Sequence, residues 1–278
     1  MTYEELFRRG RDKLSEIPCG DVDAKYLLFK VTGFNTGDYI LRSREEAEEA
    51  VAEEYENLLN LRKERVPLQH ILGEWDFFGY DFYTEPGALI PRPETEILVE
   101  EAIALIPFGG RILDIGVGTG CIPISIILSL NGKAFGLGVD ISGEALRVAA
   151  KNRERHKISE TDLVLLESDL FENVEGTFDL ITSNPPYIPE GQRESLQPEV
   201  RLYDPDLALF GGDDGLDFYR RIIREAPEYL NPGGFLIFET GHDQAGQVAE
   251  LMEQDFAGIR IVKDLCGIDR VVLGTKKS

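Results

Sequence analysis

From residue 111 onward, short apolar runs alternate with segments of helical periodicity. The runs lie at residues 111–115, 134–139, 163–166, 178–182 and 235–239. Strands that alternate with helices predict a parallel sheet covered on both faces, because each crossover helix packs back onto the sheet. Two later apolar runs, at residues 259–262 and 270–273, are expected to close the sheet as a final pair. This part of the chain is therefore predicted to be an α/β domain with a seven-stranded sheet.

The N-terminal part of the chain has a different pattern, with helical periodicity over residues 3–16, 21–32 and 44–65. After Pro67, aromatic and acidic residues alternate on both sides of Gly79, which predicts a β-hairpin. A chain of 278 residues is long enough for one large domain and a smaller one. We expect a helical domain over residues 1–73, a hairpin linker over 74–90 and the α/β domain over 91–278.

Composition and charge argue against several classes of protein. The net charge of −22 disfavours binding to nucleic-acid phosphates, which depends on clustered lysine and arginine. No apolar run reaches the ~20 residues that span a bilayer, and the N-terminus lacks the apolar core of a signal peptide. The three cysteines and three histidines have no metal-site or disulfide spacing. We expect a cytoplasmic protein with no metal, no membrane association and no direct contact with nucleic acid.

A glycine-rich turn follows the first predicted strand of the sheet. Residues 114–120 have the sequence Asp-Ile-Gly-Val-Gly-Thr-Gly, and an apolar helix is predicted over residues 122–130. Glycine lets a backbone approach a ligand closely, but this spacing departs from the G-x-G-x-x-G of dinucleotide sites. Twenty residues after Gly120, Asp140 ends the next strand, where a carboxylate can accept hydrogen bonds from both ribose hydroxyls. The glycine turn alone fits an ordinary tight turn equally well, whereas the pair indicates a nucleoside-type ligand.

A second acidic residue, Asp169, follows the third predicted strand and is expected at the same edge of the sheet. There it could hold the exocyclic amine of an adenine. An isolated aspartate at such a place is more often a helix cap or a turn residue.

The segment Asn184-Pro185-Pro186-Tyr187 comes directly after the predicted strand 178–182 and Ser183. Ligands of open α/β sheets bind at the carboxyl ends of the strands. Neither proline has an N–H to donate, so the exposed backbone groups are acceptors. The Asn184 side-chain oxygen and the Pro185 carbonyl together match the two hydrogens of a planar NH₂ group, and Tyr187 adds an aromatic surface. Alone, the segment would indicate only a loop fixed by prolines.

These features together resemble a class I methyltransferase of the amino-methylating type. Asn-Pro-Pro-Tyr is shared with adenine-specific DNA methyltransferases, so it specifies a planar nitrogen acceptor more than a substrate class. Other segments are similar to the hallmarks of the HemK/PrmC family, the peptide chain release factor glutamine methyltransferases. They are Pro-Leu-Gln-His-Ile-Leu-Gly-Glu at residues 67–74, Ile-Pro-Arg-Pro-Glu-Thr-Glu at 90–96, Glu-Val-Arg at 199–201 and Gly-Gly-Asp-Asp-Gly-Leu at 211–216.

The resemblance implies a Rossmann-like methyltransferase domain, S-adenosyl-L-methionine as cofactor and class I peptide chain release factors as protein substrates. The methyl acceptor would be the glutamine of their Gly-Gly-Gln motif, and the N-terminal helical domain would help to grip the release factor. Residues Asn184, Pro185, Pro186 and Tyr187 would bind the glutamine, and Asn184, Pro185 and Tyr187 would be catalytic. The cofactor would be contacted by Asp114, Gly116, Val117, Gly118, Thr119, Gly120, Asp140, Asp169, Leu170 and Asn184.

An amide nitrogen is a poor nucleophile, because its lone pair is delocalised into the carbonyl. Catalysis must hold it in line with the methyl donor and stabilise the charge that develops on nitrogen, and two fixed acceptors would do both. The sequence identifies no general base.

Several alternatives remain at the level of sequence. Adenine in nucleic acid would satisfy the same two acceptors, and a sister group methylates a ribosomal-protein glutamine but lacks the Arg-Pro-Glu-Thr-Glu segment present here. A non-catalytic module that senses the cofactor is disfavoured by the intact Asn184. The charged residues Arg92, Glu94 and Glu96 fit either a cofactor clamp or a cluster of interdomain salt bridges.

Overall fold

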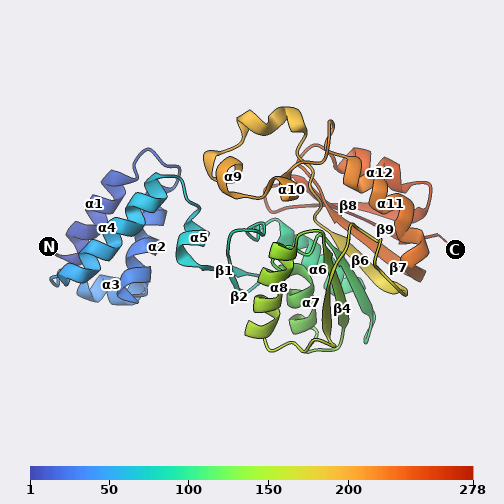
Figure 1. Cartoon of the computed structure of the whole chain (residues 1–278), viewed down its shortest axis with the longest axis horizontal. Helices are drawn as coiled ribbons and strands as arrows, with labels where there is room; N and C mark the ends of the chain where they lie inside the picture. Colours follow the sequence, from blue (N-terminus) through green and yellow to red (C-terminus); the bar gives the residue numbers. More distant parts are fainter. Residues whose placement is uncertain (278) are drawn as a thin grey trace. The chain divides into compact units, whose positions relative to one another are not determined.

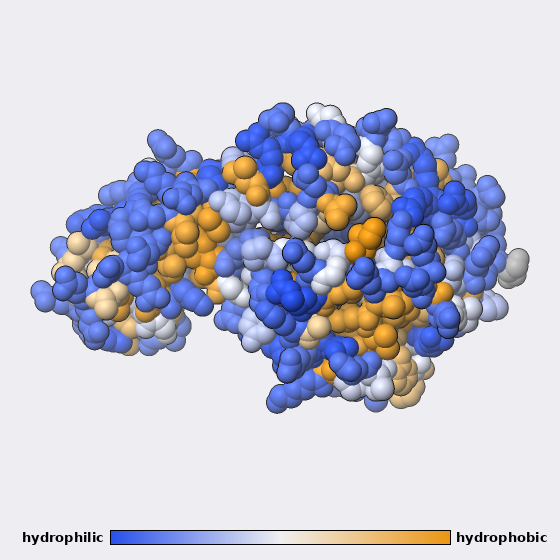
Figure 2. Space-filling model, in the orientation of Figure 1, coloured by the Kyte–Doolittle hydropathy of each residue, from blue (hydrophilic) through white to orange (hydrophobic). Residues whose placement is uncertain are grey.

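The computed structural model describes residues 1–277, which form two compact units (Figure 1). The helical unit consists of Met1–Gly73 and Gln197–Tyr203, and the sheet unit consists of Glu74–Leu196 and the chain from Asp204 onward. Hydrophilic residues cover most of the face drawn in Figure 2, as expected from the net charge of −22. Among residues 1–277, no helix has the length and apolar composition needed to cross a membrane.

The helical unit contains six helices, of which the first two match the predicted segments closely. They are α1 (Tyr3–Lys13), α2 (Gly20–Thr32), α3 (Thr36–Arg42), α4 (Glu49–Lys63), α5 (Leu68–Leu72) and α9 (Pro198–Tyr203). A capping box fixes the start of α1, since Thr2 Oγ1 accepts from Glu5 N and Glu5 accepts from Thr2 N. Tyr55, Leu59, Leu27 and Leu28 are almost fully buried between α2 and α4.

The helix predicted over residues 44–65 starts later than expected, and a separate helix precedes it. Residues before α4 pair with the N-terminus instead, because Tyr3 N donates to Glu45 O and Ala47 N to Met1 O. The prediction missed α3 because this helix buries no residue and so shows no apolar stripe. Its local signal was the capping box formed by Asn35 and Asp38.

A buried group of charged residues joins α9 to the rest of the helical unit. Arg62 Nε lies 2.6 Å from Asp23 Oδ2, and Arg62 Nη2 lies 2.8 Å from Glu199 Oε1. Arg65 Nη2 donates to the second oxygen of Glu199 at 2.7 Å. Burial raises the pKa of the Asp23 carboxyl and the Arg62 guanidinium opposes that rise. Arg62 therefore pairs with two carboxylates that lie far apart in the sequence, and Arg65 gives Glu199 a second partner.

The sheet unit begins with the predicted hairpin, formed by β1 (Glu74–Phe77) and β2 (Tyr80–Tyr83). Phe77 pairs with Tyr80, so the loop has two residues. Phe78 and Gly79 both have positive φ, 55° and 75°, as a type I′ turn requires, and this explains the glycine.

All seven predicted strands of the main sheet occur, in the order β5-β4-β3-β6-β7-β9-β8. Strand β9 runs antiparallel to β7 and β8, and the other neighbours are parallel. Strand β7 begins five residues earlier than predicted, because Leu230 pairs with Phe178 although Pro232 and two glycines interrupt the apolar pattern. The strands are β3 (Arg111–Ile115), β4 (Phe135–Asp140), β5 (Leu163–Glu167), β6 (Phe178–Ser183), β7 (Leu230–Glu239), β8 (Phe256–Lys263) and β9 (Asp269–Lys276).

Helices cover the sheet on two sides and form two hydrophobic cores (Figure 1). Leu98 and Ile124 belong to one core, and Tyr219 and Val248 belong to the other. The helices of this unit are α6 (Thr95–Leu105), α7 (Cys121–Ser129), α8 (Gly143–Arg155), α10 (Asp206–Leu209), α11 (Asp217–Tyr229) and α12 (Ala245–Met252), with a 3₁₀ helix at Glu190–Ser195. The expected seven-stranded α/β fold with a helical region and a hairpin is confirmed.

Replacing Arg62 by methionine should destabilise the helical unit by about 3–5 kcal/mol, because the buried Asp23 carboxylate would lose its ion-pair partner and Glu199 would keep only Arg65. Urea unfolding followed by circular dichroism measures this loss. The matched control is Arg9→Met in the same unit, where the side chain is 54% exposed in its pair with Glu56 and a change below about 1 kcal/mol is expected. Equal effects of the two substitutions would contradict the proposed importance of the buried group.

Candidate active site

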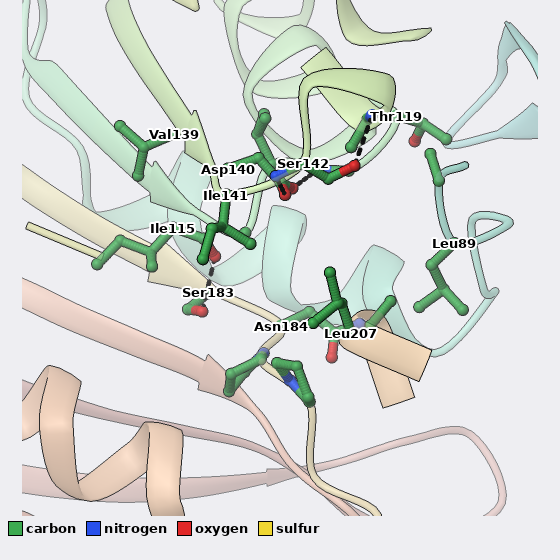
Figure 3. A pocket seen from close by; sticks show the side chains of 18 of the residues that line it. Leu89, Ile115, Thr119, Val139, Asp140, Ile141, Ser142, Ser183, Asn184 and Leu207 are labelled. Carbon is green, nitrogen blue, oxygen red and sulfur yellow. Dashed lines mark hydrogen bonds between the residues drawn. The ribbon is translucent and has the colours of Figure 1, made fainter. Parts of the chain in front are cut away.

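A cavity opens at the carboxyl ends of the central parallel strands (Figure 3). Register explains why its walls meet there, since Ile115 of β3 pairs with Val139 of β4 and with Ser183 of β6. The segments that follow these three strands therefore begin at the same level of the sheet. Lining residues that the sequence had singled out are Gly116, Val117, Gly118, Thr119, Asp140, Asp169, Leu170, Asn184, Pro185 and Pro186.

The three glycines of the turn serve two different purposes, which their geometry distinguishes. Gly116 and Gly118 have φ of 74° and 54°, and a Cβ on Gly116 would meet no atom of residues 1–277 within 4 Å. Both line the cavity, so their missing side chains leave room for a ligand. Gly120 does not line it, and a Cβ there would approach Ile124 Cδ1 to 3.0 Å. The third glycine is therefore required for the packing of α7.

Asp140 is held by backbone amides that leave lone pairs available. Its Oδ2 accepts from Gly118 N at 3.0 Å and its Oδ1 from Ser142 N at 2.9 Å. Burial raises the pKa of the carboxyl, and these N–H groups oppose that rise. Each carboxylate oxygen can accept a second bond, so the fixed side chain can receive two ligand hydroxyls.

Asp169 and Leu170 lie in a turn after β5, not at the start of a helix. The Asp169 carboxylate pairs with Arg221 of α11 at 2.9 Å, and both residues line the cavity. Leu170 has a φ of 51°, which is unusual for a leucine and is stabilised by a bond of 3.0 Å from Ser168 Oγ to its carbonyl. The leucine is 8% exposed and contributes an apolar wall.

The Asn-Pro-Pro-Tyr segment begins where β6 ends, and Ser183 Oγ donates to Ile115 O at 2.8 Å (Figure 3). The Asn184 Nδ2 group donates to Thr95 Oγ1 at 3.4 Å, and both residues line the cavity. Within residues 1–277, neither Asn184 Oδ1 nor the Pro185 carbonyl receives a hydrogen bond. The two acceptors expected from the sequence are thus available.

Tyr187 and Asp114 do not line the cavity. The Tyr187 carbonyl accepts from Gln244 Nε2 at 2.9 Å, and its ring packs against the core beside Gly241. Asp114 is fully buried, with Oδ1 accepting from Thr182 Oγ1 at 2.7 Å, and burial raises its pKa to about 7. Through this hydrogen bond Asp114 links β3 to β6 beneath the cavity.

The charged residues that the sequence left open take separate positions. Arg92 lines the cavity and pairs with Asp204 at 2.6 Å, whereas Glu96 Oε1 accepts from Phe78 N at 2.8 Å. Sequence reasoning missed other lining residues, including Leu89, Leu207 and Arg221. Leu89 directly precedes the segment at residues 90–96, whereas Leu207 and Arg221 lie in α10 and α11, and no local pattern marks any of the three.

Comparison with known proteins assigns the chain to a family. Residues 5–73 match the model of the PrmC N-terminal domain, and residues 93–199 match the methyltransferase small domain. The release factor glutamine methyltransferase of Geobacter sulfurreducens is 49% identical over 219 residues, which are 78% of this chain and 76% of that protein. The enzyme of that name from Fusobacterium nucleatum is 40% identical over 98% of this chain and 78% of its own.

The chain belongs to the release factor glutamine methyltransferase family.

Solved structures support the fold of this family member. A methyltransferase of Pyrococcus furiosus has a TM-score of 0.56 and 21% identity, and covers 73% of this chain and 91% of its own. The catalytic domain of human Mettl16, solved with an RNA hairpin, has a TM-score of 0.58 and 16% identity, over 83% of each chain. At these identities the likeness establishes the fold alone.

The cavity fits S-adenosyl-L-methionine, the cofactor of this family. The open space beside Gly116 admits a ligand that lies close to the backbone. Asp140 offers acceptors for ribose hydroxyls, and Leu170 supplies an apolar wall. Over the described chain, no group of three or more His, Cys, Asp or Glu side chains is placed to hold a metal ion.

Gly116→Ala should weaken binding of S-adenosyl-L-methionine at least about tenfold, or about 1.4 kcal/mol, because the methyl would occupy ligand space. Isothermal titration calorimetry measures the Kd. Gly132→Ala is the matched control, since Gly132 has φ of 72°, also has open space around its Cβ and does not line the cavity. Both substitutions should cost about 1–2 kcal/mol of stability through backbone strain. If Gly116→Ala binds as tightly as Gly132→Ala, the ligand does not lie against the turn.

Proposed function

We propose that this protein transfers the methyl group of S-adenosyl-L-methionine to the side-chain amide nitrogen of the glutamine in the Gly-Gly-Gln motif of class I peptide chain release factors. The observation that carries the proposal is that Asn184 and Pro185 line the same cavity as Gly116 and Asp140. The residues that we assign to the methyl donor and to the amide acceptor thus line one cavity. The names of the relatives, 35–49% identical to this chain, support the release factor as substrate.

The cofactor end of the cavity lies over the glycine turn. We assign the ribose hydroxyls to Asp140, whose two oxygens are already oriented by Gly118 N and Ser142 N. The adenine would lie against Leu170, with Asp169 near its amine. Gly120 and Asp114 act from behind this end, through helix packing and strand pairing. The remaining contacts are assigned to Gly116, Val117, Thr119 and Asn184.

The acceptor end lies at the Asn-Pro-Pro-Tyr segment. The Asn184 Oδ1 and the Pro185 carbonyl would accept the two hydrogens of the glutamine NH₂ group, which fixes the nitrogen in position. Pro186 also lines the cavity, and Tyr187 would border the amide from the core side.

S-adenosyl-L-methionine, when bound, would supply an electrophilic methyl: its S–CH₃ bond would break as the N–CH₃ bond forms, its demethylated remainder would leave as a neutral thioether, and the nitrogen would release one proton to solvent. The protein's part is positional and electrostatic. The Asn184 Oδ1 and the Pro185 carbonyl would hold the amide nitrogen in line with the methyl group and stabilise the positive charge that develops on the nitrogen. Both acceptors are oriented before the substrate binds. A cavity with apolar walls strengthens these interactions by excluding water.

We further propose the domain division 1–73, 74–90 and 91–278, in which the first domain recognises the release factor. The protein would act in the cytoplasm, on a protein partner, without binding membrane or nucleic acid directly. The net charge of −22 supports the last point.

Asn184→Ala should lower kcat by roughly 10²-fold or more, as expected when a transition-state acceptor is lost, with at most a modest change in cofactor Kd. A timed methyl-transfer assay measures kcat, and isothermal titration calorimetry measures the cofactor Kd. Asn231→Ala is the matched control, since this asparagine loses one side-chain bond, to Asp179, and does not line the cavity. An equal loss of cofactor binding and transfer would reduce Asn184 to a cofactor ligand.

The proposed function itself is tested by mass spectrometry of a class I release factor incubated with the protein and S-adenosyl-L-methionine. One added methyl on the motif glutamine is expected, and none on a release factor whose glutamine is replaced by alanine. DNA and RNA substrates are run beside it. Transfer to adenine without transfer to glutamine would overturn the substrate assignment and leave the fold and the cofactor site intact.

A further inference from the structure

A buried glutamate lies behind Asn184. Glu239 is the last residue of β7, and the preceding residue, Phe238, pairs with Ser183 of β6. The residues that follow this pair in the two chain segments, Glu239 and Asn184, are therefore neighbours. Thr95, the first residue of α6, adjoins both, and Glu239 and Thr95 are only 2% and 3% exposed.

The surroundings of this carboxylate do not suit a purely structural role. Thr95 and Asn184 lie close enough to lower its pKa as hydrogen-bond donors, but its Oε2 has no hydrogen-bond partner within residues 1–277. No ion pair to Glu239 is formed in the described chain, and the nearby Arg270 pairs with Asp264 at 3.2 Å. A buried and incompletely paired carboxylate costs stability, and such groups concentrate at functional sites.

Hydrogen-bond chemistry determines how Asn184 must face. An ionised carboxylate only accepts, so a neighbouring asparagine can approach it only with its NH₂ group. The Thr95 hydroxyl, when it donates to Glu239, likewise accepts from Asn184 Nδ2, which lies 3.4 Å from Thr95 Oγ1. Both contacts select the same orientation of the amide and turn Oδ1 toward the cavity. The reverse orientation would set Oδ1 against the carboxylate.

We propose that Glu239 is a positioning residue that orients the Asn184 side chain, directly and through Thr95, so that Oδ1 faces the methyl acceptor. The inference rests on the proposed function, in which Asn184 Oδ1 accepts a hydrogen of the acceptor NH₂ group. Glu239 does not line the cavity, whereas Thr95 and Asn184 do, so it acts through them and not on the substrate.

The orientation depends on the charge of Glu239, and this gives the proposal a pH signature. Burial raises the pKa of the carboxyl to about 7, and the donors Thr95 and Asn184 oppose that rise. The other charged or titratable groups that face it are Arg270 from β9, Glu94 before α6, Cys121 of α7, Tyr187 and Tyr219 of α11. Below the folded pKa the carboxyl is protonated and can donate, so it no longer selects one orientation of Asn184.

The first experiment observes Asn184 directly in the full-length protein without substrate. In a sample with ¹⁵N-labelled asparagine, the side-chain NH₂ signals of Asn184 are those missing from the Asn184→Ala spectrum. They should shift with pH with a midpoint near 7 in the unaltered protein, and the shift should vanish in Glu239→Gln. A shift that persists in Glu239→Gln, or no shift in the unaltered protein, would overturn the proposal.

The second experiment is a double-mutant cycle on methyl transfer. Glu239→Gln should lower kcat at least about tenfold, with a cofactor KM within about twofold, and should remove the loss of activity below pH 7. In the Asn184→Ala background the same substitution should change kcat less than about twofold, because the residue it positions is gone. Losses that multiply independently would show that Glu239 acts elsewhere and would overturn the proposal.

Three further variants and a thermal unfolding measurement test whether loss of folding explains the result. Glu100→Gln, an exposed position of the same helix as Thr95, should leave kcat and the pH profile unchanged. Thr95→Val should lower kcat like Glu239→Gln, and Thr95→Ser, which keeps the hydroxyl, should restore it. Glu239→Gln should unfold at the same or a higher temperature, since a buried charge is removed. Failure of serine to restore transfer would contradict the role given to the hydroxyl.

Failure of this inference can be told from failure of the proposed function. If the protein methylates adenine instead of glutamine, the double-mutant cycle is measured on the kcat of adenine methylation. The positioning role of Glu239 is then tested independently of the substrate assignment. If no acceptor is methylated, the NMR titration still decides it.

Discussion

The site depends on the hydrogen-bond register of three neighbouring parallel strands, β4, β3 and β6. Ile115 pairs with Val139 on one side and Ser183 on the other, so the glycine turn, Asp140 and Asn184 all begin at one level. Two side-chain bonds reinforce the β3–β6 pair, from Thr182 to Asp114 and from Ser183 to the Ile115 carbonyl. A slip of one residue would turn each of these side chains to the opposite face and dismantle the cavity wall.

The same edge of the sheet concentrates buried acids in a protein that is already strongly acidic. Burial raises the pKa of Asp114, Asp140 and Glu239, and each is held by a different set of donors. Asp140 accepts from backbone amides, Asp114 accepts from one threonine, and Glu239 has the donor groups of Thr95 and Asn184 beside it. Buried carboxylates with so few partners lower the stability of the fold. Their presence indicates that they serve to fix the geometry around the ligand.

Much of the fold could be predicted, and the errors have local causes. The strands and the hairpin were found because apolar runs, alternation and Gly79 are local signals. Helix α3 was missed because it buries nothing, and the start of α4 was misplaced because residues 45–47 pair with the N-terminus. In the site, the cavity includes Gly116, Asp140 and Asn184 as expected, but Tyr187 packs toward the core. Glu239 had a signal that was overlooked, since it ends an apolar strand as Asp140 does.

The sequence by itself determined the alternation of strands and helices, the positions that require glycine, and the acceptor chemistry of Asn184 and Pro185. These follow from side-chain periodicity, backbone dihedral limits and the missing N–H of proline, all of which act over a few residues. Only the tertiary structure decided that Arg62 joins Asp23 to Glu199, that Leu207 lines the cavity and that Glu239 and Thr95 lie beside Asn184. Those relations depend on strand order and burial, which bring distant segments together and set the charge of groups removed from water.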